Sequence, residues 1–270
     1  LFNEFSPEIV FHAAAYKHVP LMESTPYEAV KINIGGTKNI ADLALQYKSE
    51  KFVLVSTDKA VNPTNIMGAT KRIAEMYISS INKKAKGETK YITTRFGNVL
   101  GSNGSVIPLF KKQIEQGGPL TLTHRDITRY FMTIPEACQL VIEAGVMGNG
   151  GEIFIFDMGA SVKIYDLAKK MIQLSGFKYP QEIDIKVTGL RPGEKLYEEL
   201  LNDGENTMPT HHEKIMISKV RALDYESTML AINELCLQNL EGDTDTVVLK
   251  IKTIVPEYIS QNSVFASLDK

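Results

Sequence analysis

Lys51-Phe52-Val53-Leu54-Val55-Ser56 is the stretch that decides the fold. Its apolar run is short and continuous and leads into Thr57-Asp58-Lys59, which is typical of a strand buried in a parallel sheet. A Pro/Asn-rich loop follows, then a helical pattern from about Met67 to Asn82, and then the strand-like run Tyr91–Phe96. This strand–helix–strand order predicts an α/β fold with a largely parallel sheet.

The alternation continues on both sides of this unit. Further elements are expected as strands at Ile9–Phe11, Leu120–Leu122, Ile153–Phe156 and Ile183–Val187, and as helices near Pro26–Tyr47, Val106–Gln116, Pro135–Val146, Ile164–Leu174, Tyr225–Gln238 and Asp243–Ile254. The segment beyond Glu205 is the least informative part of the chain.

Composition limits the classes of function. The chain has 270 residues, 43% of them hydrophobic and 23% charged, with a net charge of −2, which favours a soluble globular protein and no nucleic-acid partner. The two cysteines, Cys138 and Cys236, fit a reducing compartment and no disulfide framework. His211-His212 has no third ligand at usable spacing, so no metal is expected. No apolar run approaches the ~18–20 residues that span a bilayer, which predicts a cytoplasmic location without membrane contact from this segment.

A dinucleotide-binding fold normally opens with a strand, a Gly-x-Gly-x-x-Gly turn and a helix. No such sequence occurs here, and the glycine-rich loop Gly97–Gly104 comes late and has the wrong spacing. The chain also starts at Leu1 without a methionine. We therefore expect the dinucleotide-fingerprint region to be missing from the amino end.

The residues that could carry chemistry follow the central strand. Asp58 and Lys59 put a potential acid beside a potential base at a strand end, where open parallel sheets bind ligands. Met67 and Lys71 lie one helical turn apart on the same face of the next helix. Taken singly, these residues would also suit a solvated loop and an ordinary surface lysine.

The joint run from Ser56 to Arg72 resembles the active-site segment of the extended short-chain dehydrogenase/reductase family, and within it the nucleotide-sugar 4,6-dehydratases of polysaccharide biosynthesis. The resemblance covers roughly residues 5–220. The other matching blocks are His12–Glu23, Asn33 with Gly36-Thr37, Arg95–Pro108, Thr128–Met132 and Gly189–Leu200.

The resemblance implies a Rossmann-like sheet and a reaction that uses NAD or NADP. In that reaction C4 of the sugar is oxidised, water is eliminated from C5 and C6, and the hydride returns to C6. It implies that Asp58 is the acid, that Lys59 is the base, and that Thr57 hydrogen-bonds the C4 oxygen. Lysine can act as a base only if its pKa falls well below its usual value of ~10.4. The implied cofactor contacts are Ala13, Ala14, Ala15, Lys17, Asn33, Ser56 and Lys71, the last on the nicotinamide ribose.

Met67 departs from the pattern of most of the family, which has tyrosine there as the base for C4 oxidation. A thioether has no proton to exchange, so Met67 cannot do that task. A branch of large, membrane-anchored bacterial dehydratases is similar in carrying methionine, which implies a parent protein anchored to the inner membrane. The group that takes the C4 hydroxyl proton stays open between the Asp58/Lys59 pair and a water held by Thr57.

The implied substrate is a UDP-sugar, with UDP-N-acetylglucosamine as the family inference. The expected substrate contacts are Asn98, Pro108, Thr121, Leu122, Arg129, Arg191 and Glu194, the two arginines on the diphosphate.

The expected division assigns residues 1–100 and 126–158 to the NAD(P)-binding domain, and residues 101–125 and 159–270 to a smaller substrate lobe. A 4-epimerase on the same fold and a non-catalytic nucleotide-sugar-binding fragment are the alternatives, and a homo-oligomer stays open.

Overall fold

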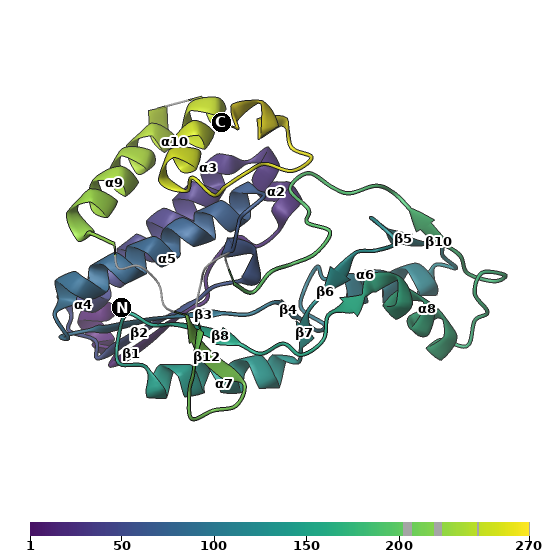
Figure 1. Ribbon diagram of the computed structural model, residues 1–270, viewed down its shortest axis with the longest axis horizontal. Helices are drawn as coiled ribbons and strands as arrows, with labels where there is room; N and C mark the ends of the chain where they lie inside the picture. Colours follow the sequence, from purple (N-terminus) through teal and green to yellow (C-terminus); the bar gives the residue numbers. More distant parts are fainter. Residues whose placement is uncertain (202–206, 219–222, 242, 270) are drawn as a thin grey trace.

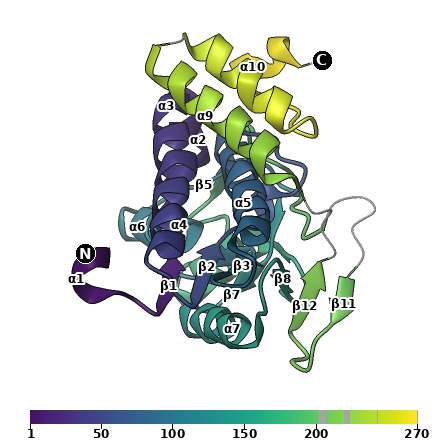
Figure 2. The same cartoon turned by 90° about the vertical axis from the view of Figure 1, so that its left-hand side faces the viewer.

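The main sheet confirms the expected α/β fold. The computed structural model describes residues 1–201, 207–218, 223–241 and 243–269. Within these residues the sheet has six strands in the order β1-β2-β3-β8-β12-β11 (Figure 2). Their bounds are β1 (Ile9–His12), β2 (Lys51–Val55), β3 (Lys90–Arg95), β8 (Ile153–Phe156), β12 (Ile215–Ser218) and β11 (Thr207–Pro209). The strands β1, β2, β3 and β8 are parallel, whereas β12 and β11 run antiparallel to their neighbours.

Helices cover both faces of this sheet (Figure 1). α4 (Thr37–Gln46) and α5 (Ile66–Ala85) lie on one face, and α7 (Ile134–Met147) lies on the other. Alternate side chains of β2 divide between the two layers, since Phe52 and Leu54 join the core cluster of α5 whereas Val53 joins that of α7. This period of two explains why the apolar run of β2 has no polar break: both of its faces are buried.

The helical pattern expected at Pro26–Tyr47 is one run with a widened turn. It consists of α3 (Pro26–Ala29), the π-helical segment η1 (Val30–Gly36) and α4. A π turn inside an α-helix commonly marks a functional position. Here it contains the fully buried Asn33.

A smaller lobe lies beyond the carboxyl ends of the parallel strands (Figure 1). It is built from α6 (Val106–Glu115), α8 (Ile164–Leu174) and the parallel pair β5 (Leu120–Leu122) and β10 (Ile185–Val187), which share a separate apolar cluster. The remaining elements are α1 (Phe2–Phe5), α2 (Val19–Ser24), η2 (Asp58–Ala60), β4 (Asn98–Val99), β6 (Thr128–Arg129), β7 (Phe131–Met132), β9 (Val162–Lys163), α9 (Tyr225–Glu241), α10 (Thr244–Ile254) and η3 (Val264–Leu268).

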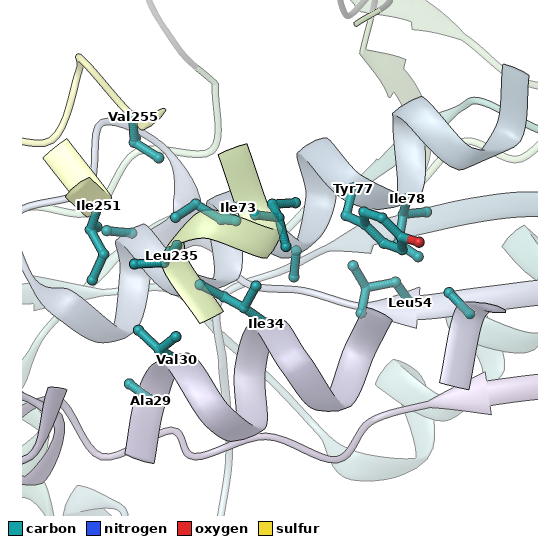
Figure 3. Packing of buried hydrophobic residues seen from close by; sticks show 14 of the residues in the cluster. Ala29, Val30, Ile34, Leu54, Ile73, Tyr77, Ile78, Leu235, Ile251 and Val255 are labelled. Carbon is teal, nitrogen blue, oxygen red and sulfur yellow. The ribbon is translucent and has the colours of Figure 1, made fainter. Parts of the chain in front are cut away.

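The carboxyl-terminal part of the expected domain division is wrong. β11 and β12 extend the main sheet, and α9 and α10 pack on the α5 layer rather than on the smaller lobe. Figure 3 shows Leu235 of α9 and Ile251 of α10 among the same buried side chains as Ile34 and Ile73. The physical reason is that the apolar faces of α9 and α10 complete the core above α5, which would otherwise be open to solvent on that side.

No helix in the described ranges combines the length and apolar character needed to cross a membrane.

Candidate active site

Three loops that follow parallel strands meet at one edge of the main sheet. β1 leads into residues 13–17, β2 leads into Ser56–Lys59, and β3 leads into Phe96–Asn98. Backbone bonds from Ser56 N to Thr94 O (2.8 Å) and from Asp58 N to Phe96 O (3.1 Å) continue the pairing of β2 with β3 past the strand ends. The edge is where open parallel sheets place their ligand sites.

Four side chains form what we call the front cluster: Thr57, Asp58, Lys59 and Glu198. Asp58 is fully buried, and its Oδ1 accepts hydrogen bonds from Thr57 Oγ1 and from Lys59 Nζ, each at 2.9 Å. Lys59 Nζ also donates to Asn98 Oδ1 at 3.0 Å and lies 3.4 Å from Glu198 Oε1. The predicted residues Thr57, Asp58, Lys59 and Asn98 are therefore in direct contact.

Each carboxylate of the front cluster keeps one buried oxygen unused. Asp58 Oδ2 and Glu198 Oε2 have no hydrogen-bond partner within the described part of the chain. A Cβ on Gly97 would lie 3.1 Å from Asp58 Oδ2, so any larger residue at this position would crowd that oxygen. Buried polar atoms are normally satisfied, so each of these oxygens is expected to meet a water, a ligand or a reacting group.

The electrostatics of the front cluster correct one expectation. Burial by itself lowers the pKa of Lys59, but the carboxylates of Asp58 and Glu198 outweigh it, and the pKa is raised above its ordinary value. The lowered pKa expected for a lysine base is therefore absent in this arrangement, because two carboxylates, Asp58 and Glu198, stabilise its ammonium. Burial raises the pKa of Glu198 itself, and the charge of Asp58 acts in the same direction.

Ser56, Arg72, Glu75 and Arg95 form a second buried group behind the strand ends, which we call the rear cluster. Both oxygens of Glu75 are used: Oε1 accepts from Ser56 Oγ (2.6 Å) and Arg95 Nε (2.9 Å), and Oε2 accepts from Arg95 Nη2 (2.7 Å) and Arg72 Nη1 (3.3 Å). Burial alone would raise the pKa of Glu75, but the charge of Arg95 and its hydrogen bonds hold it below the ordinary value. The hydroxyl of Ser56, a predicted cofactor contact, is therefore directed to Glu75.

Met67 and Lys71 lie at the start of α5. Met67 is buried within the apolar core, as its thioether would require. Lys71 Nζ donates to Val55 O at 2.6 Å, and burial lowers its pKa to about 8. Lys71 is thus fixed at the strand end, and its contact with a nicotinamide ribose stays a prediction.

The loop after β1 offers an open backbone for a cofactor. Ala13 and Ala14 are exposed, Ala15 is half-buried and Lys17 is exposed. Asn33 holds this loop from the π turn: its Oδ1 accepts from Tyr16 N at 2.8 Å and its Nδ2 donates to Tyr16 O at 3.1 Å. Asn33 therefore orders the loop, whereas the small exposed residues leave room beside it. This arrangement fits a dinucleotide lying across the sheet edge.

Arg129 does not have the environment that was expected. Its side chain is buried, Nη1 donates to Thr128 O (2.7 Å), and Nη2 donates to Lys195 O (2.8 Å). Its Nε lies 3.6 Å from Glu198 Oε1. These contacts commit the guanidinium to holding the Glu194–Glu198 segment, so the structure gives no support to a diphosphate role for Arg129.

The other predicted substrate residues lie on the smaller lobe or on the Gly189–Leu200 segment. Arg191 is exposed and pairs with Glu194 at 3.4 Å. Thr121 bonds Gln113, Leu122 is buried in the smaller lobe, and Pro108 is half-buried on α6. Within the part of the chain that the structure describes, no hydrogen bond or ion pair joins these side chains to the front cluster, and their roles remain predictions.

Sequence reasoning missed Glu198, Glu75 and Arg95. Glu198 lay inside the quoted Gly189–Leu200 block, and Arg95 opened another. The available signal was a charged residue within an otherwise apolar context, such as Arg95 at the end of a buried strand. The partner of Arg95, which is Glu75, could not be predicted without the fold.

A family profile described as polysaccharide biosynthesis protein matches residues 1–220, and the chain belongs to that family. It is 61% identical over 218 residues to the capsular polysaccharide biosynthesis protein CapD of Staphylococcus aureus, covering 81% of this chain and 36% of CapD. It is 56% identical over 234 residues to the probable polysaccharide biosynthesis protein EpsC of Bacillus subtilis, covering 87% of this chain and 39% of EpsC. The chain thus spans little more than a third of the length of these relatives.

Among solved structures, Pen from Bacillus thuringiensis superposes with a TM-score of 0.73 at 38% identity, over 84% of this chain and 75% of Pen. The dTDP-glucose 4,6-dehydratase DesIV of Streptomyces venezuelae, with NAD bound, has a TM-score of 0.63 at 20% identity, over 72% of this chain and 64% of DesIV. The UDP-glucose 4-epimerase of Thermus thermophilus, in complex with NAD, has a TM-score of 0.62 at 21% identity, over 74% of this chain and 70% of that enzyme. The last two likenesses show the shared fold alone.

Proposed function

We propose that this chain carries the reaction centre of an NAD(P)-dependent nucleotide-sugar 4,6-dehydratase. The substrate would be a UDP-N-acetylhexosamine, in the first place UDP-N-acetylglucosamine. The observation that carries the proposal is the buried Asp58–Lys59 pair at the strand end, with Asp58 Oδ2 unpartnered among the described residues. Elimination of water needs an acid and a base side by side, whereas C4 epimerisation needs no such pair.

NAD(P)+, when bound, would supply the hydride acceptor for C4 and the donor for C6. The residues that would hold it are Ala13, Ala14 and Ala15 of the loop after β1, with Lys17 and Lys71, all at the sheet edge. DesIV and the Thermus thermophilus epimerase, which share the fold, are both described with NAD bound. The open backbone of this loop supports the same use here.

Thr57 and Asp58 give a route for the C4 hydroxyl proton that does not involve Met67. Thr57 Oγ1 donates to Asp58 Oδ1 at 2.9 Å, so a proton taken up by Thr57 can pass to the carboxylate as its own proton leaves. Asp58 then carries the proton that the departing C6 hydroxyl requires to leave as water. One carboxylate thereby receives a proton in the first half of the reaction and returns it in the second.

Arg191 and Glu194 would meet the nucleotide side, with Asn98, Pro108, Thr121 and Leu122 lining the approach from the smaller lobe. Arg191 is exposed and reaches Glu194 only at 3.4 Å, so its guanidinium is accessible to phosphate oxygens.

The direct test is to incubate the purified full-length protein with NAD+ and UDP-N-acetylglucosamine and to follow the sugar by NMR. We expect a 4-keto-6-deoxy product and, in deuterated water, solvent deuterium at C5. A C4 epimer without loss of water would identify an epimerase instead. Unchanged sugar together with tight calorimetric binding of the UDP-sugar would identify a binding protein.

A further inference from the structure

Glu198 is a buried carboxylate to which the proposed reaction assigns no role. It belongs to the segment between β10 and β11, far from η2 in sequence, and its side chain is 2% exposed. Its Oε1 lies 3.4 Å from Lys59 Nζ and 3.6 Å from Arg129 Nε, and its Oε2 has no hydrogen-bond partner within the described residues. A carboxylate this close to Lys59, the predicted base, can exchange a proton with it.

We propose that Glu198 is the proton partner of Lys59: it holds the ammonium beside Asp58 in the resting protein and takes its proton when the sugar covers the site. Glu198 is a positioning residue in this scheme, because it acts on the substrate through Lys59. The inference rests on the proposed function, since it assigns to Lys59 the base role in elimination.

The proton steps balance. One proton passes from Lys59 Nζ to Glu198 Oε1, which converts an ammonium–carboxylate pair into an amine and a carboxylic acid. The Lys59 lone pair takes the C5 proton, and the electron pair left at C5 expels the C6 hydroxyl, which leaves as water with the proton held by Asp58. Lys59 later returns its proton to C5, and Glu198 gives its own proton back to Lys59 when the product leaves, which restores the ammonium–carboxylate pair.

Burial is the physical reason for the transfer. The Lys59 side chain is still 18% exposed, so its ammonium keeps some contact with water until a sugar covers it. Removing that water penalises both charges of the pair and favours the two neutral forms. Burial is already the largest influence on both groups, acting to lower the pKa of Lys59 and to raise that of Glu198.

The charges around Glu198 come from three parts of the fold. Asp58 and Lys59 face it from η2, Arg129 faces it from β6, and Lys195 and Glu194 belong to its own segment. Arg129 also ties that segment down through the carbonyls of Lys195 and Leu196, at 2.8 and 3.3 Å. The position of Glu198 is therefore fixed by contacts that survive the loss of its own charge.

The test compares Glu198→Gln with Glu199→Gln in the full-length protein. Glu199 is the next residue, is 48% exposed and pairs with Lys195, so it is a matched control outside the site. Glutamine keeps the size and an acceptor oxygen but cannot accept the proton. We expect the kcat of Glu198→Gln to fall about 10²-fold at neutral pH with KM changed less than about threefold.

The pH profile separates this role from a structural one. Without Glu198, Lys59 must lose its proton to solvent, so kcat of Glu198→Gln should rise about tenfold per pH unit above neutrality while wild type and Glu199→Gln stay flat. A profile parallel to wild type would overturn the proposal.

A second readout does not depend on turnover. In protein labelled with ¹³C-lysine, the NMR titration of Lys59, assigned with Lys59→Arg, should move down by at least about one pH unit in Glu198→Gln, because a negative neighbour is lost. An unmoved titration would refute the pairing. If wild type forms no 4-keto product, the proposed function fails, and this titration still decides whether Glu198 controls the proton of Lys59.

Discussion

The rear and front clusters each combine buried acidic and basic side chains, yet they differ in how far their polar atoms are satisfied. In the rear cluster both Glu75 oxygens accept hydrogen bonds, and Arg95 is enclosed completely. In the front cluster Asp58 and Glu198 each retain an oxygen without a partner in the described residues.

This difference indicates which cluster stabilises the fold and which takes part in the reaction. A fully paired buried network fixes the elements that carry it, here β3 and α5, and leaves nothing for a ligand. An incompletely paired network costs stability unless something else completes it, and it is placed where three strand-end loops meet. We therefore assign scaffolding to the rear cluster and proton transfer to the front cluster.

The largest expected effect is on turnover, from the front cluster. Asp58→Asn should lower the rate of 4-keto product formation by ~10²–10⁴-fold, because the amide cannot relay the C4 proton to the C6 hydroxyl. UDP-sugar affinity and the thermal unfolding midpoint should stay close to wild type, as calorimetry and circular dichroism would show. Near-normal turnover in this variant would remove Asp58 from the reaction.

The rear cluster should respond in stability rather than in chemistry. Arg95→Met leaves the Glu75 carboxylate buried with only Ser56 and Arg72 as partners, and should cost ~3–5 kcal/mol of unfolding free energy in urea denaturation. Arg125→Met is the control: Arg125 is exposed over the Tyr165 ring, and its loss should cost about 1 kcal/mol or less. Equal losses of unfolding free energy in the two variants would show that the rear cluster stabilises the fold no more than an exposed arginine does.

The next prediction concerns the pH dependence of stability, which should depend on the buried side chain of His12 at the end of β1. His12 bonds Thr37 at 3.0 Å, and burial, with the nearby charge of Lys71, lowers its pKa from 6.5 to about 4. The unfolded chain therefore binds this proton first, so stability is full above pH 6.5 and falls as the pH drops towards 4, by at most about 3 kcal/mol. His12→Gln should flatten urea-denaturation stability over this range. Parallel curves for the two proteins would contradict the assignment.

The smallest effect is expected at the outer margin of the front cluster. Arg191→Ala should raise KM for the UDP-sugar about tenfold with kcat little changed, because an exposed guanidinium would contact the diphosphate and not the reacting carbons. Steady-state kinetics at several substrate concentrations measure both terms. A collapse of kcat at constant KM would instead place Arg191 at the sugar.

Much of the fold was readable from local pattern. The continuous apolar run Phe52–Val55 predicted a strand buried on both faces, and the helix–strand alternation predicted the parallel sheet. The tail was misassigned to the smaller lobe because amphipathic helices such as α10 show an apolar face without showing which surface it covers.

By itself the sequence determined the order of strands and helices, the Thr57-Asp58-Lys59 group at a strand end, and the inability of Met67 to act as a base. These follow from short-range spacing and from the chemistry of single side chains. Only the tertiary structure decided that Glu198 lies against Lys59 and raises its pKa, and that Arg129 is committed to backbone carbonyls. The reason is that burial and Coulomb interaction depend on distances in space, and those distances join residues that the chain keeps far apart.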